Sequence, residues 1–445
     1  MQQLEDQVQS DLKRINIPGK LWVCPVDCSY VTSPLDVAIV GGGMGGNAVG
    51  LALFKLGIVN IKIFDSSTAG KEGPWKTYAR MKQLRSSKPL QGPALDIPSL
   101  TFRSWFEAIY GSETWEIIDF IPTDLWADYL IWYRKVLQLP VENEMKLVKI
   151  TPLGDFFELT FENNGSFTTY FSRKIVLATG MGGVGGNSLP PYSSNISKEF
   201  YIHTSEPIDP VTIVGKKIGI IGAGASAFDA AAFSLENGAA QVDMIIRREK
   251  ISLVNRLAQF SYPGIQHGFY TLSDDIRCHI LADTLACGIP PPKSAFYRLE
   301  NQENFYIHLD TEVQKVDSSQ SGVTLETNNG SFEFDFIFFA TGFAIDGTKT
   351  RELADHMANI LLWEDVVPSE SLRCMPKLGQ FPYLGPHFEF LELSPGAAPY
   401  LKNIHCFNYG AFLSHGPITS NIDGVSVGAS RLAEGIAIDL FIQNR

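Results

Sequence analysis

The sequence predicts a protein of the α/β class, built from two strand–turn–helix units. The first unit starts with the apolar residues 35–40 and the second with residues 217–221, and a glycine-rich turn follows each run directly. Helical stretches come next, at residues 47–56 and from the turn at 222–227 to about 237, and another β-branched run follows each of them. Strands and helices that alternate in this order favour parallel sheets covered by helices.

The size and composition of the chain fit a globular protein of more than one domain. It has 445 residues, of which 45% are hydrophobic and 19% are charged. A formal net charge of −12 repels phosphate backbones, so we expect no nucleic-acid binding. The sequence shows neither a signal peptide nor a run of about 18 uncharged apolar residues. We therefore expect a cytoplasmic protein without a membrane span.

The cysteines predict neither a redox pair nor a metal site. No two of them form a C-x-x-C pair, and no second Cys/His pair with metal-ligand spacing accompanies Cys24 and Cys28. Ordinary, partly buried thiols are the expectation. The six cysteines are Cys24, Cys28, Cys278, Cys287, Cys374 and Cys406.

The first glycine-rich turn, G-G-G-M-G-G at residues 41–46, has the G-x-G-x-x-G pattern of a Rossmann-type dinucleotide site. Its glycines are Gly41, Gly43 and Gly46, and a helix that begins there directs its N-terminus at the phosphates. Asp65 ends the next strand, 24 positions after Gly41, where a carboxylate accepts hydrogen bonds from a ribose. This order of elements predicts binding of FAD or NAD(H), whereas a glycine turn alone would indicate only a hairpin or a helix cap.

The second turn, G-A-G-A-S-A at residues 222–227, repeats the pattern with one substitution. Gly222 and Gly224 stand at the first two glycine positions, and Ala227 replaces the third. Ser226 lies within the predicted first helical turn. We assign this turn to a second dinucleotide.

The strand after the second turn ends in two arginines instead of an acid. Arg247 and Arg248 are placed where a guanidinium can bind the 2′-phosphate of NADPH. A solvated basic pair at a sheet edge is the alternative. An acidic first unit and a basic second unit predict two cofactors, FAD and NADPH, and hydride transfer between them.

Two further strands end in the same tripeptide, A-T-G. Gly180 and Gly342 are the last residues of these segments, and runs that suggest β-meanders precede them at residues 146–170 and 305–334. Here the chain resembles flavoproteins with two dinucleotide sites, in which A-T-G segments mark crossings between the two domains. The resemblance covers nearly the whole chain and implies a three-layer ββα arrangement with an NADPH domain inserted into an FAD domain.

Within that group the chain is most similar to the single-component flavoprotein monooxygenases. These include the flavin-containing monooxygenases, the Baeyer–Villiger monooxygenases and the N-hydroxylases of ornithine or lysine. Residues 200–206 resemble their linker F-x-G-x-x-x-H-x-x-x-(W/Y), with His203 at the histidine, although the glycine and the final aromatic residue are absent. The helical residues 126–133 resemble a helix near the substrate, with an aromatic core helix as the alternative.

Two other segments of the resemblance imply residues close to the flavin. G-P-W at residues 73–75 and L-R-S-S-K at 84–88 are similar to the flavin-side loops, so Trp75 would bind FAD, and Ser87 and Lys88 would approach its reactive face. Near the C-terminus, His415 and Thr419 precede a predicted helix at about 425–441, whose N-terminus would lie at the flavin pyrimidine. For His415, a loop histidine without a catalytic role is an equal alternative.

The resemblance implies a monooxygenase that inserts one atom of O₂ into a small organic substrate through a flavin C4a-hydroperoxide. N- or S-oxygenation is favoured over Baeyer–Villiger chemistry because the linker fingerprint is incomplete. A flavoprotein reductase or oxidase that passes electrons to O₂ or to a partner remains the alternative, and a non-catalytic regulator is a third. The protein is expected to act on its own or as a homo-oligomer.

These assignments divide the chain into three parts. Residues 1–30 form a helical extension, in which Leu4, Val8, Leu12 and Ile15 recur at helical spacing. Residues 31–205 and 335–445 form the FAD domain, and residues 206–334 form the NADPH domain. Within the latter, residues 262–269 and 288–292 either enclose substrate or nicotinamide or form surface loops.

Overall fold

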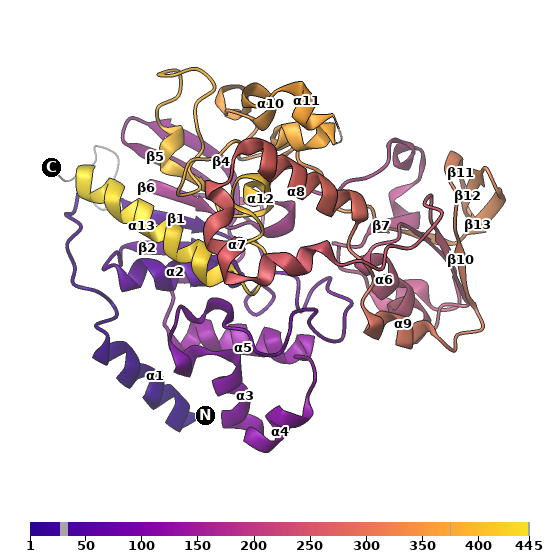
Figure 1. Cartoon of the computed structure of the whole chain (residues 1–445), viewed down its shortest axis with the longest axis horizontal. Coiled ribbons are helices and arrows are strands. Elements are labelled where there is room, and N and C mark those ends of the chain that lie inside the picture. The colour runs from indigo at the N-terminus through magenta and orange to yellow at the C-terminus, as the bar shows by residue number, and fades with distance from the viewer. Residues whose placement is uncertain (27–33, 374, 444–445) are drawn as a thin grey trace.

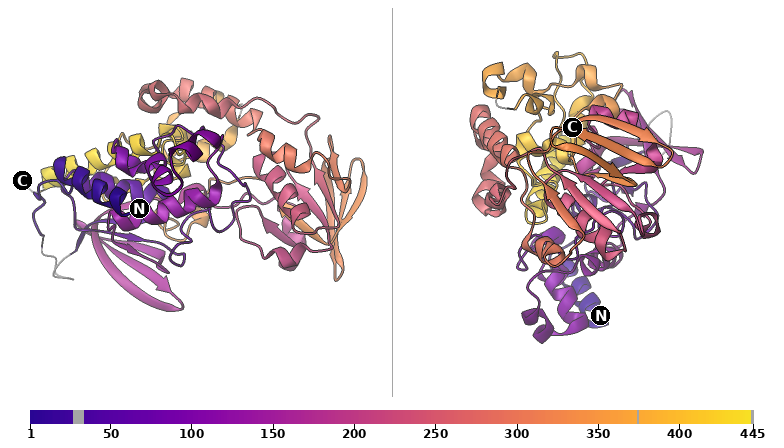
Figure 2. Two further views of the ribbon diagram at one scale, coloured as in Figure 1. Left: turned by 90° about the horizontal axis from the view of Figure 1, so that it is seen from below. Right: turned by 90° about the vertical axis from the view of Figure 1, so that its right-hand side faces the viewer.

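The computed structural model of the chain describes residues 1–26, 34–373 and 375–443 and shows a larger and a smaller lobe (Figure 1). Figure 2 shows both lobes from two further directions. The expected boundary at residues 30–31 and two of the cysteines, Cys28 and Cys374, lie outside the described residues. No helix among the described residues is long and apolar enough to cross a membrane.

A seven-stranded sheet forms the centre of the larger lobe. The strand β1 lies between β2 and β6 and is parallel to both, as expected for a Rossmann-like unit. The strands, in spatial order, are β3 (Val141–Glu142), β2 (Ile61–Phe64), β1 (Leu35–Val40), β6 (Ser166–Leu177), β5 (Phe156–Asn163) and β4 (Lys146–Leu153), and β15 (Ile404–Cys406) also pairs with β6.

The first β-meander shares a strand with the parallel sheet. Up to Ser172, β6 pairs antiparallel with β5, and from Ser172 onward it pairs parallel with β1. Exposure follows this change, because the last six residues of β6 are buried while the first four are exposed. The meander is therefore a continuation of the sheet, carried by the 12-residue strand β6.

Helices cover the larger lobe on the side of α2 (Met44–Lys55) and α13 (Val425–Gln443), which lie side by side (Figure 1). α1 is amphipathic as expected and buries Val8 and Leu12. Ile15 does not belong to its apolar face, because the helix ends at Arg14 and Ile15 is 52% exposed. The other helices of this lobe are α1 (Gln2–Arg14), α3 (Phe102–Tyr110), α4 (Ser112–Ile117) and α5 (Thr123–Val136).

The smaller lobe has a parallel sheet and a separate antiparallel one. Phe305–His308 was expected in the second meander, but it pairs parallel with β9 at the edge of the parallel sheet. That sheet runs β10 (Phe305–His308), β9 (Gln241–Ile245), β8 (Lys217–Ile221), β14 (Phe336–Phe339) and β7 (Tyr201–His203). The antiparallel sheet consists of β11 (Val313–Ser319), β12 (Gly322–Thr327) and β13 (Gly330–Phe334).

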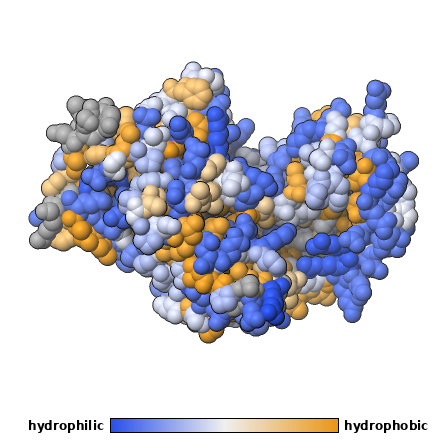
Figure 3. Space-filling model, turned by 90° about the horizontal axis from the view of Figure 1, so that it is seen from above, coloured by the Kyte–Doolittle hydropathy of each residue, from blue (hydrophilic) through white to orange (hydrophobic). Residues whose placement is uncertain are grey.

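The lobes do not follow the expected domain boundaries throughout. β7 and β14 belong to the smaller lobe although they lie just outside residues 206–334. α6 (Ala225–Glu236) and α9 (Lys293–Leu299) cover its sheet. α7 (Pro263–Gly268) and α8 (Asp274–Cys287) instead cross to the larger lobe, where their apolar side chains join one core with those of α10 (Trp363–Val366), α11 (Ser369–Leu372) and α12 (Phe412–His415) (Figure 1). Seen from above, the surface is hollowed between the lobes (Figure 3).

A buried cation attaches α13 to the sheet. Lys174 of β6 is fully buried, and its Nζ lies 2.6 Å from both the Asp439 carboxylate and the Asn403 side-chain oxygen. A buried ammonium without a counter-charge is strongly unfavourable, so this ion pair stabilises the position of α13. Burial lowers the pKa of Lys174, and hydrogen bonding to Asp439 opposes that effect.

We expect Asp439→Ala to lower the midpoint of thermal unfolding by about 3–6 °C, because it leaves the Lys174 charge buried without its carboxylate. Asp317→Ala is the matched control, since Asp317 pairs with Lys315 on an exposed strand. Thermal unfolding followed by circular dichroism measures both variants. Equal effects of the two substitutions would show that burial of the Lys174 charge is unimportant.

Three of the four buried histidines among the described residues strongly resist protonation, and burial lowers the pKa of the fourth, His356, as well. Burial lowers the pKa of His203 to about 4 and that of His405 to about 3, and it holds the pKa of His415 well below its usual value. The unfolded chain takes up protons near pH 6.5, whereas the folded chain does not. Stability is therefore present above pH 6.5 and is lost as the pH falls toward the folded-state pKa values.

We expect His203, His405 and His415 each to remove about 1.5 kcal/mol of stability between pH 6.5 and pH 5. His405→Leu tests one of them, because its Nε2 has no hydrogen-bond partner among the described residues. The variant should lose less thermal stability than the wild type when the pH falls from 7 to 5. The same loss in both proteins would contradict a depressed pKa at His405.

Candidate functional site

The first glycine turn lies between β1 and α2 and combines two crowded positions with one open position. Gly41 has a φ of 109°, and a Cβ there would lie 2.3 Å from the carbonyl oxygen of Ala178. A Cβ on Gly46 would lie 1.9 Å from the carbonyl oxygen of Gly41. At Gly43, the nearest heavy atom is the Cα of Gly73, 3.8 Å away. The free space at Gly43 fits a dinucleotide pyrophosphate, which approaches the backbone there.

Asp65 is held against this turn by the backbone. One carboxylate oxygen accepts a hydrogen bond from the amide of Gly42 and the other accepts one from the amide of Ser67, both at 2.7 Å. The residue is only 8% exposed. Asp65 thus orders the glycine turn, and a ribose would have to use the remaining lone pairs of the carboxylate.

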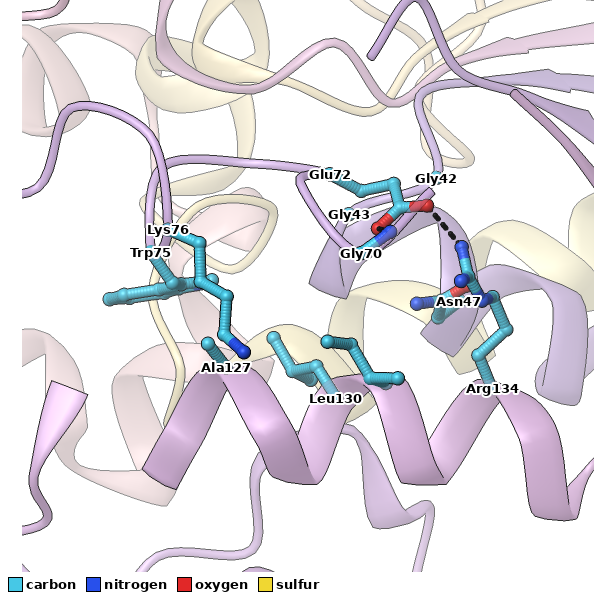
Figure 4. Close-up of a pocket in the computed structure, with 11 residues that line it drawn as sticks. Gly42, Gly43, Asn47, Gly70, Glu72, Trp75, Lys76, Ala127, Leu130 and Arg134 are labelled. Carbon is cyan, nitrogen blue, oxygen red and sulfur yellow. Dashed lines mark hydrogen bonds and ion pairs between the residues drawn. The ribbon is translucent and has the colours of Figure 1, made fainter. Parts of the chain in front are cut away.

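A pocket opens beside the turn, between the loop of residues 70–76 and helix α5 (Figure 4). The ring of Trp75 lies edge-on to Trp126 of α5, with centroids 6.2 Å apart. The side-chain oxygen of Asn47, in the first turn of α2, is buried and has no hydrogen-bond partner among the described residues. The lining residues are Gly42, Gly43, Asn47, Gly70, Glu72, Trp75, Lys76, Ala127, Leu130, Ile131 and Arg134.

Glu72 and Arg134 form the charged part of this pocket. They make an ion pair, drawn as the dashed line in Figure 4, and Glu72 also accepts a hydrogen bond of 2.6 Å from Asn143. The Glu72 side chain is 7% exposed. No sequence motif predicts that Asn47, Glu72 and Arg134 line one pocket, because they come from three separate elements with no characteristic spacing. The one sequence signal is the position of Glu72 directly before the G-P-W segment, which indicates that Glu72 lies near Trp75.

The second glycine turn repeats the geometry of the first. Gly222 has a φ of 136°, and a Cβ there would lie 2.4 Å from the carbonyl oxygen of Ala340. At Gly224, only the carbonyl oxygen of Ile289 lies within 4 Å, at 3.7 Å. The structure thus brings residues 288–292 next to the second turn. As in the first turn, the open glycine leaves room for a pyrophosphate.

Helix α6 starts directly after this turn. Ser226 is exposed near its N-terminus, and Ala227 is fully buried at the position of the third glycine. A methyl group at Gly46 would collide with the backbone of the first turn, whereas the second turn accommodates the methyl group of Ala227 at the corresponding position. Ser226 is therefore available to a phosphate at the helix N-terminus, where backbone amides also point.

The basic pair lies beyond β9, at the same end of the sheet as the second turn. Arg248 donates a 3.0 Å hydrogen bond to the carbonyl oxygen of Cys287. Arg247 is exposed and forms no ion pair with any described carboxylate. Its positive charge acts on the neighbouring Tyr192, although burial still raises the pKa of that phenol to about 12. Arg247 is consequently the freer of the two guanidinium groups.

The A-T-G segments follow β6 and β14 at the two crossing points. Gly180 and Gly342 have φ values of 72° and 78°, and a Cβ on either would meet no heavy atom within 4 Å. Thr179 accepts a 3.1 Å hydrogen bond from the side chain of Asn408, which attaches the C-terminal segment to the first crossing. Both glycines thus border open space beside a dinucleotide turn.

Thr419 lies next to the first turn. Its hydroxyl donates a 2.8 Å hydrogen bond to the carbonyl oxygen of Asn408. A Cβ on Gly45 would lie 3.7 Å from the carbonyl oxygen of Thr419. The structure thus brings together the first glycine turn, the first A-T-G crossing and the segment before α13.

His415 is enclosed by protein on all sides. Its Nε2 lies 3.0 Å from the carbonyl oxygen of Gly385, and its Nδ1 lies 3.3 Å from Arg431. The ring stacks on Tyr270 and Phe388, with centroid distances of 4.6 and 4.0 Å. Arg431 is a cation and only donates, so Nδ1 accepts and Nε2 carries the proton. With both nitrogens engaged and a depressed pKa, His415 joins α12, α13 and the segment after α7 as a neutral ring.

Lys88 and Ser87 differ in their surroundings. Lys88 donates a 2.8 Å hydrogen bond to the carbonyl oxygen of Trp115, and its Nζ lies 4.9 Å from the centroid of the Trp115 ring. Ser87 is exposed. Lys88 thus contacts α4, whereas Ser87 remains available to a ligand.

His203 is buried at the end of β7, in the linker segment. Its Nδ1 lies 2.7 Å from the hydroxyl of Ser205, which donates in turn to Asn187. Its ring packs against Phe343 in a T-shaped arrangement, with centroids 5.9 Å apart.

Helix α5 has one aromatic core face, because Trp126, Tyr129 and Tyr133 are fully buried, which agrees with the alternative of an aromatic core helix. The opposite face lines the pocket of Figure 4.

The described cysteines are free thiols with dissimilar surroundings. Cys24 is exposed, Cys278 and Cys406 are buried, and Cys287 is intermediate. Burial raises the pKa of the Cys278 thiol to about 11, which opposes formation of a thiolate. The described part of the chain also holds no group of three His, Cys, Asp or Glu side chains that could bind a metal.

Comparisons with known proteins agree with this geometry. Residues 38–274, more than half of the chain, match the family described as Pyridine nucleotide-disulphide oxidoreductase. An FAD-dependent urate hydroxylase from Xanthomonas campestris pv. campestris is 36% identical over 446 aligned positions, which cover 100% of this chain and 93% of that protein.

Solved structures of similar fold include two ornithine hydroxylases. The enzyme from Pseudomonas aeruginosa superimposes with a TM-score of 0.72 at 16% identity and covers 91% of this chain and 99% of that one. The ornithine N-hydroxylase from Kutzneria sp. 744 has a TM-score of 0.70 at 15% identity, with the same coverage of both chains. At these identities the likeness concerns the fold.

The family match and the fold shared with the solved structures confirm the prediction of an oxidoreductase with Rossmann-like units. The chain belongs to the pyridine nucleotide-disulphide oxidoreductase family, among its single-component flavoprotein monooxygenases.

Proposed function

We propose that this protein hydroxylates urate, or a closely related oxopurine, with NADPH and O₂ as co-substrates. The observation that carries the proposal is the 36% identity to a urate hydroxylase along the whole chain. The ornithine hydroxylases share the fold at about half that identity, so they give no comparable support for an amine substrate.

We assign FAD to the larger lobe, which holds most of residues 31–205 and 335–445, and NADPH to the smaller one, which holds most of residues 206–334 together with β7 and β14. Two open glycines, Gly43 and Gly224, support the assignment, since each lies at a helix N-terminus with room for a pyrophosphate. Bound FAD would supply the redox chemistry, taking hydride from NADPH and reacting with O₂ when reduced. The residues proposed for FAD are Gly41, Gly43, Gly46, Asp65, Trp75, Gly180, Gly342 and Thr419, and those for NADPH are Gly222, Gly224, Ser226, Ala227, Arg247 and Arg248.

The roles that we propose for Ser87, Lys88 and His415 depend on whether each side chain is already hydrogen-bonded to the protein. Ser87 is exposed and can hydrogen-bond a substrate or the flavin edge. Lys88 and His415 bond to the protein, so we propose that they position the α4 segment and the loop before α13, respectively. The N-terminus of α13 would stabilise negative charge on the reduced flavin. We also propose a cytoplasmic location, where NADPH is available.

The test uses the purified protein loaded with FAD. We expect a flavin spectrum, NADPH oxidation stimulated by urate, and a product that has gained one oxygen atom, with O₂ consumed in equal amount. L-Ornithine in place of urate is the control for N-hydroxylation. Stoichiometric hydrogen peroxide without an oxygenated product, with either substrate, would contradict the proposal and favour an oxidase.

The open glycines provide a prediction for each cofactor. We expect Gly43→Ala to fold, because its methyl group would lie no closer than 3.8 Å to any neighbouring atom, but to weaken FAD binding at least about tenfold. Gly224→Ala should retain FAD and raise KM for NADPH. Gly264→Ala is the control, since a Cβ there meets nothing within 4 Å. Flavin content and steady-state kinetics are the measurements, and an unchanged affinity for both cofactors would contradict the assignment.

Arg247 provides a prediction about the choice of nicotinamide cofactor. We expect Arg247→Gln to raise KM for NADPH about tenfold or more while leaving KM for NADH unchanged, because a charge-assisted contact to the 2′-phosphate is lost. Arg256→Gln serves as the control, since Arg256 forms an exposed ion pair with Asp283. An equal effect on both cofactors would place Arg247 outside the 2′-phosphate site.

A further inference from the structure

The loop of residues 80–85 belongs to the larger lobe in sequence, yet its cations contact the smaller lobe. Arg80 donates hydrogen bonds to the carbonyl oxygens of Thr204, at 2.6 Å, and Glu206, at 2.9 Å. Its guanidinium lies over the rings of Phe233 of α6 and Phe338 of β14, at 5.4 and 5.1 Å. The loop is thus anchored against the sheet and helix of the second dinucleotide unit.

Two carboxylates on α6 complete this contact. Asp229 and Glu236 are seven residues apart, which puts them on the same face of the helix two turns from each other. Asp229 pairs with Arg85, at 2.6 Å, and with Arg298 of α9, at 3.2 Å. Glu236 accepts two hydrogen bonds from Arg298, at 2.9 and 3.0 Å, and pairs with Lys82 at 2.8 Å.

Asp229 is the most buried charged residue of this arrangement. Its side chain is 5% exposed and that of Arg298 is 12% exposed, so their attraction is weakly screened by solvent. Lys82 is 66% exposed, and its pair with Glu236 contributes less. Replacing the Asp229 carboxylate would remove the acid that lies between Arg85, which is 37% exposed, and Arg298, which is 12% exposed.

The position of the network in the chain relates it to both proposed cofactor sites. Asp229 lies in the second turn of α6, directly after the glycine turn assigned to NADPH. Arg85 immediately precedes Ser86, Ser87 and Lys88 on the flavin side. Hydride transfer needs the donor carbon of the nicotinamide and the acceptor nitrogen of the flavin about 3–3.5 Å apart, and an error of about 1 Å reduces the rate by up to about 100-fold. The ion pair between Asp229 and Arg85 therefore joins the start of α6, next to the proposed NADPH turn, to the segment before Ser87 and Lys88, next to the proposed flavin site. The separation of these two segments affects the distance for hydride transfer.

We propose that Asp229 is a positioning residue for hydride transfer, which acts through Arg85 and Arg298 to set the distance between the nicotinamide and flavin sites. This inference rests on the proposed binding of NADPH and FAD to the two lobes. It does not depend on the identity of the substrate. A purely structural role would affect stability without affecting one half-reaction more than the other.

The test compares Asp229→Asn with Asp243→Asn in the FAD-loaded enzyme. Asp243 is the matched control: it is a buried carboxylate of the same lobe, bonded at 2.7 Å to His308 and to Gln241, away from the larger lobe. Flavin reduction by NADPH is followed by rapid mixing without O₂. Reoxidation by O₂ of enzyme reduced with dithionite is measured separately.

We expect Asp229→Asn to reduce the flavin about 10–100-fold more slowly at saturating NADPH. Its reoxidation rate should equal that of the wild type, and Asp243→Asn should reduce at nearly the wild-type rate. Wild-type reduction in Asp229→Asn, or equal slowing of both half-reactions, would overturn the proposal. If Asp229→Asn fails to fold, Arg85→Gln, whose side chain is 37% exposed, takes its place with the same expected direction.

The outcomes separate this inference from the proposed function. Rapid reduction of the wild-type flavin without oxygenation of urate would refute the substrate and leave the role of Asp229 measurable. A wild-type flavin that NADPH does not reduce would refute the proposed cofactor use itself, and the inference with it.

Discussion

Two close contacts between backbone atoms determine much of this structure. The first glycine of each turn lies so close to the carbonyl oxygen of an A-T-G alanine that a side chain would collide with it: Gly41 with Ala178 and Gly222 with Ala340. These contacts hold the C-terminal ends of the parallel neighbours β1 and β6, and of β8 and β14, close to each other. Each dinucleotide turn consequently faces the point where the chain crosses between lobes, with an open glycine, Gly43 or Gly224, beside it.

Charge burial then determines how the remaining elements are held on this framework. Lys174 attaches α13 to the first sheet through Asp439, while Asp229 joins the loop after Trp75 to α6 and α9. Both arrangements place a fully or almost fully buried charge between elements that are far apart in sequence. Because an unpaired buried charge is strongly unfavourable, such pairs favour one relative position of their elements over others. The spatial relation of the two cofactor sites depends on this kind of contact.

The side chains expected near the flavin show how burial changes the role of a residue. A histidine and a lysine in loops beside a cofactor are plausible proton carriers, yet His415 is enclosed between two rings and Lys88 is bonded to Trp115. The residues that line the pocket of Figure 4 include Asn47, Glu72 and Arg134, none of which stood out in the sequence. The sequence gives the chemical type of each side chain, whereas the hydrogen-bond partners of each polar atom depend on the tertiary structure.

The sequence by itself determined the two Rossmann-like units, the order of their strands and helices, and the acidic and basic ends of β2 and β9. These features are local: periodicity and glycine spacing reflect contacts between residues close in the chain. Only the tertiary structure decided that Phe305–His308 joins the parallel sheet, that α7 and α8 cross to the larger lobe, and that Asp229 meets Arg85. Those outcomes depend on apolar burial and charge pairing between segments up to 144 residues apart, for which a single sequence carries no periodic signal.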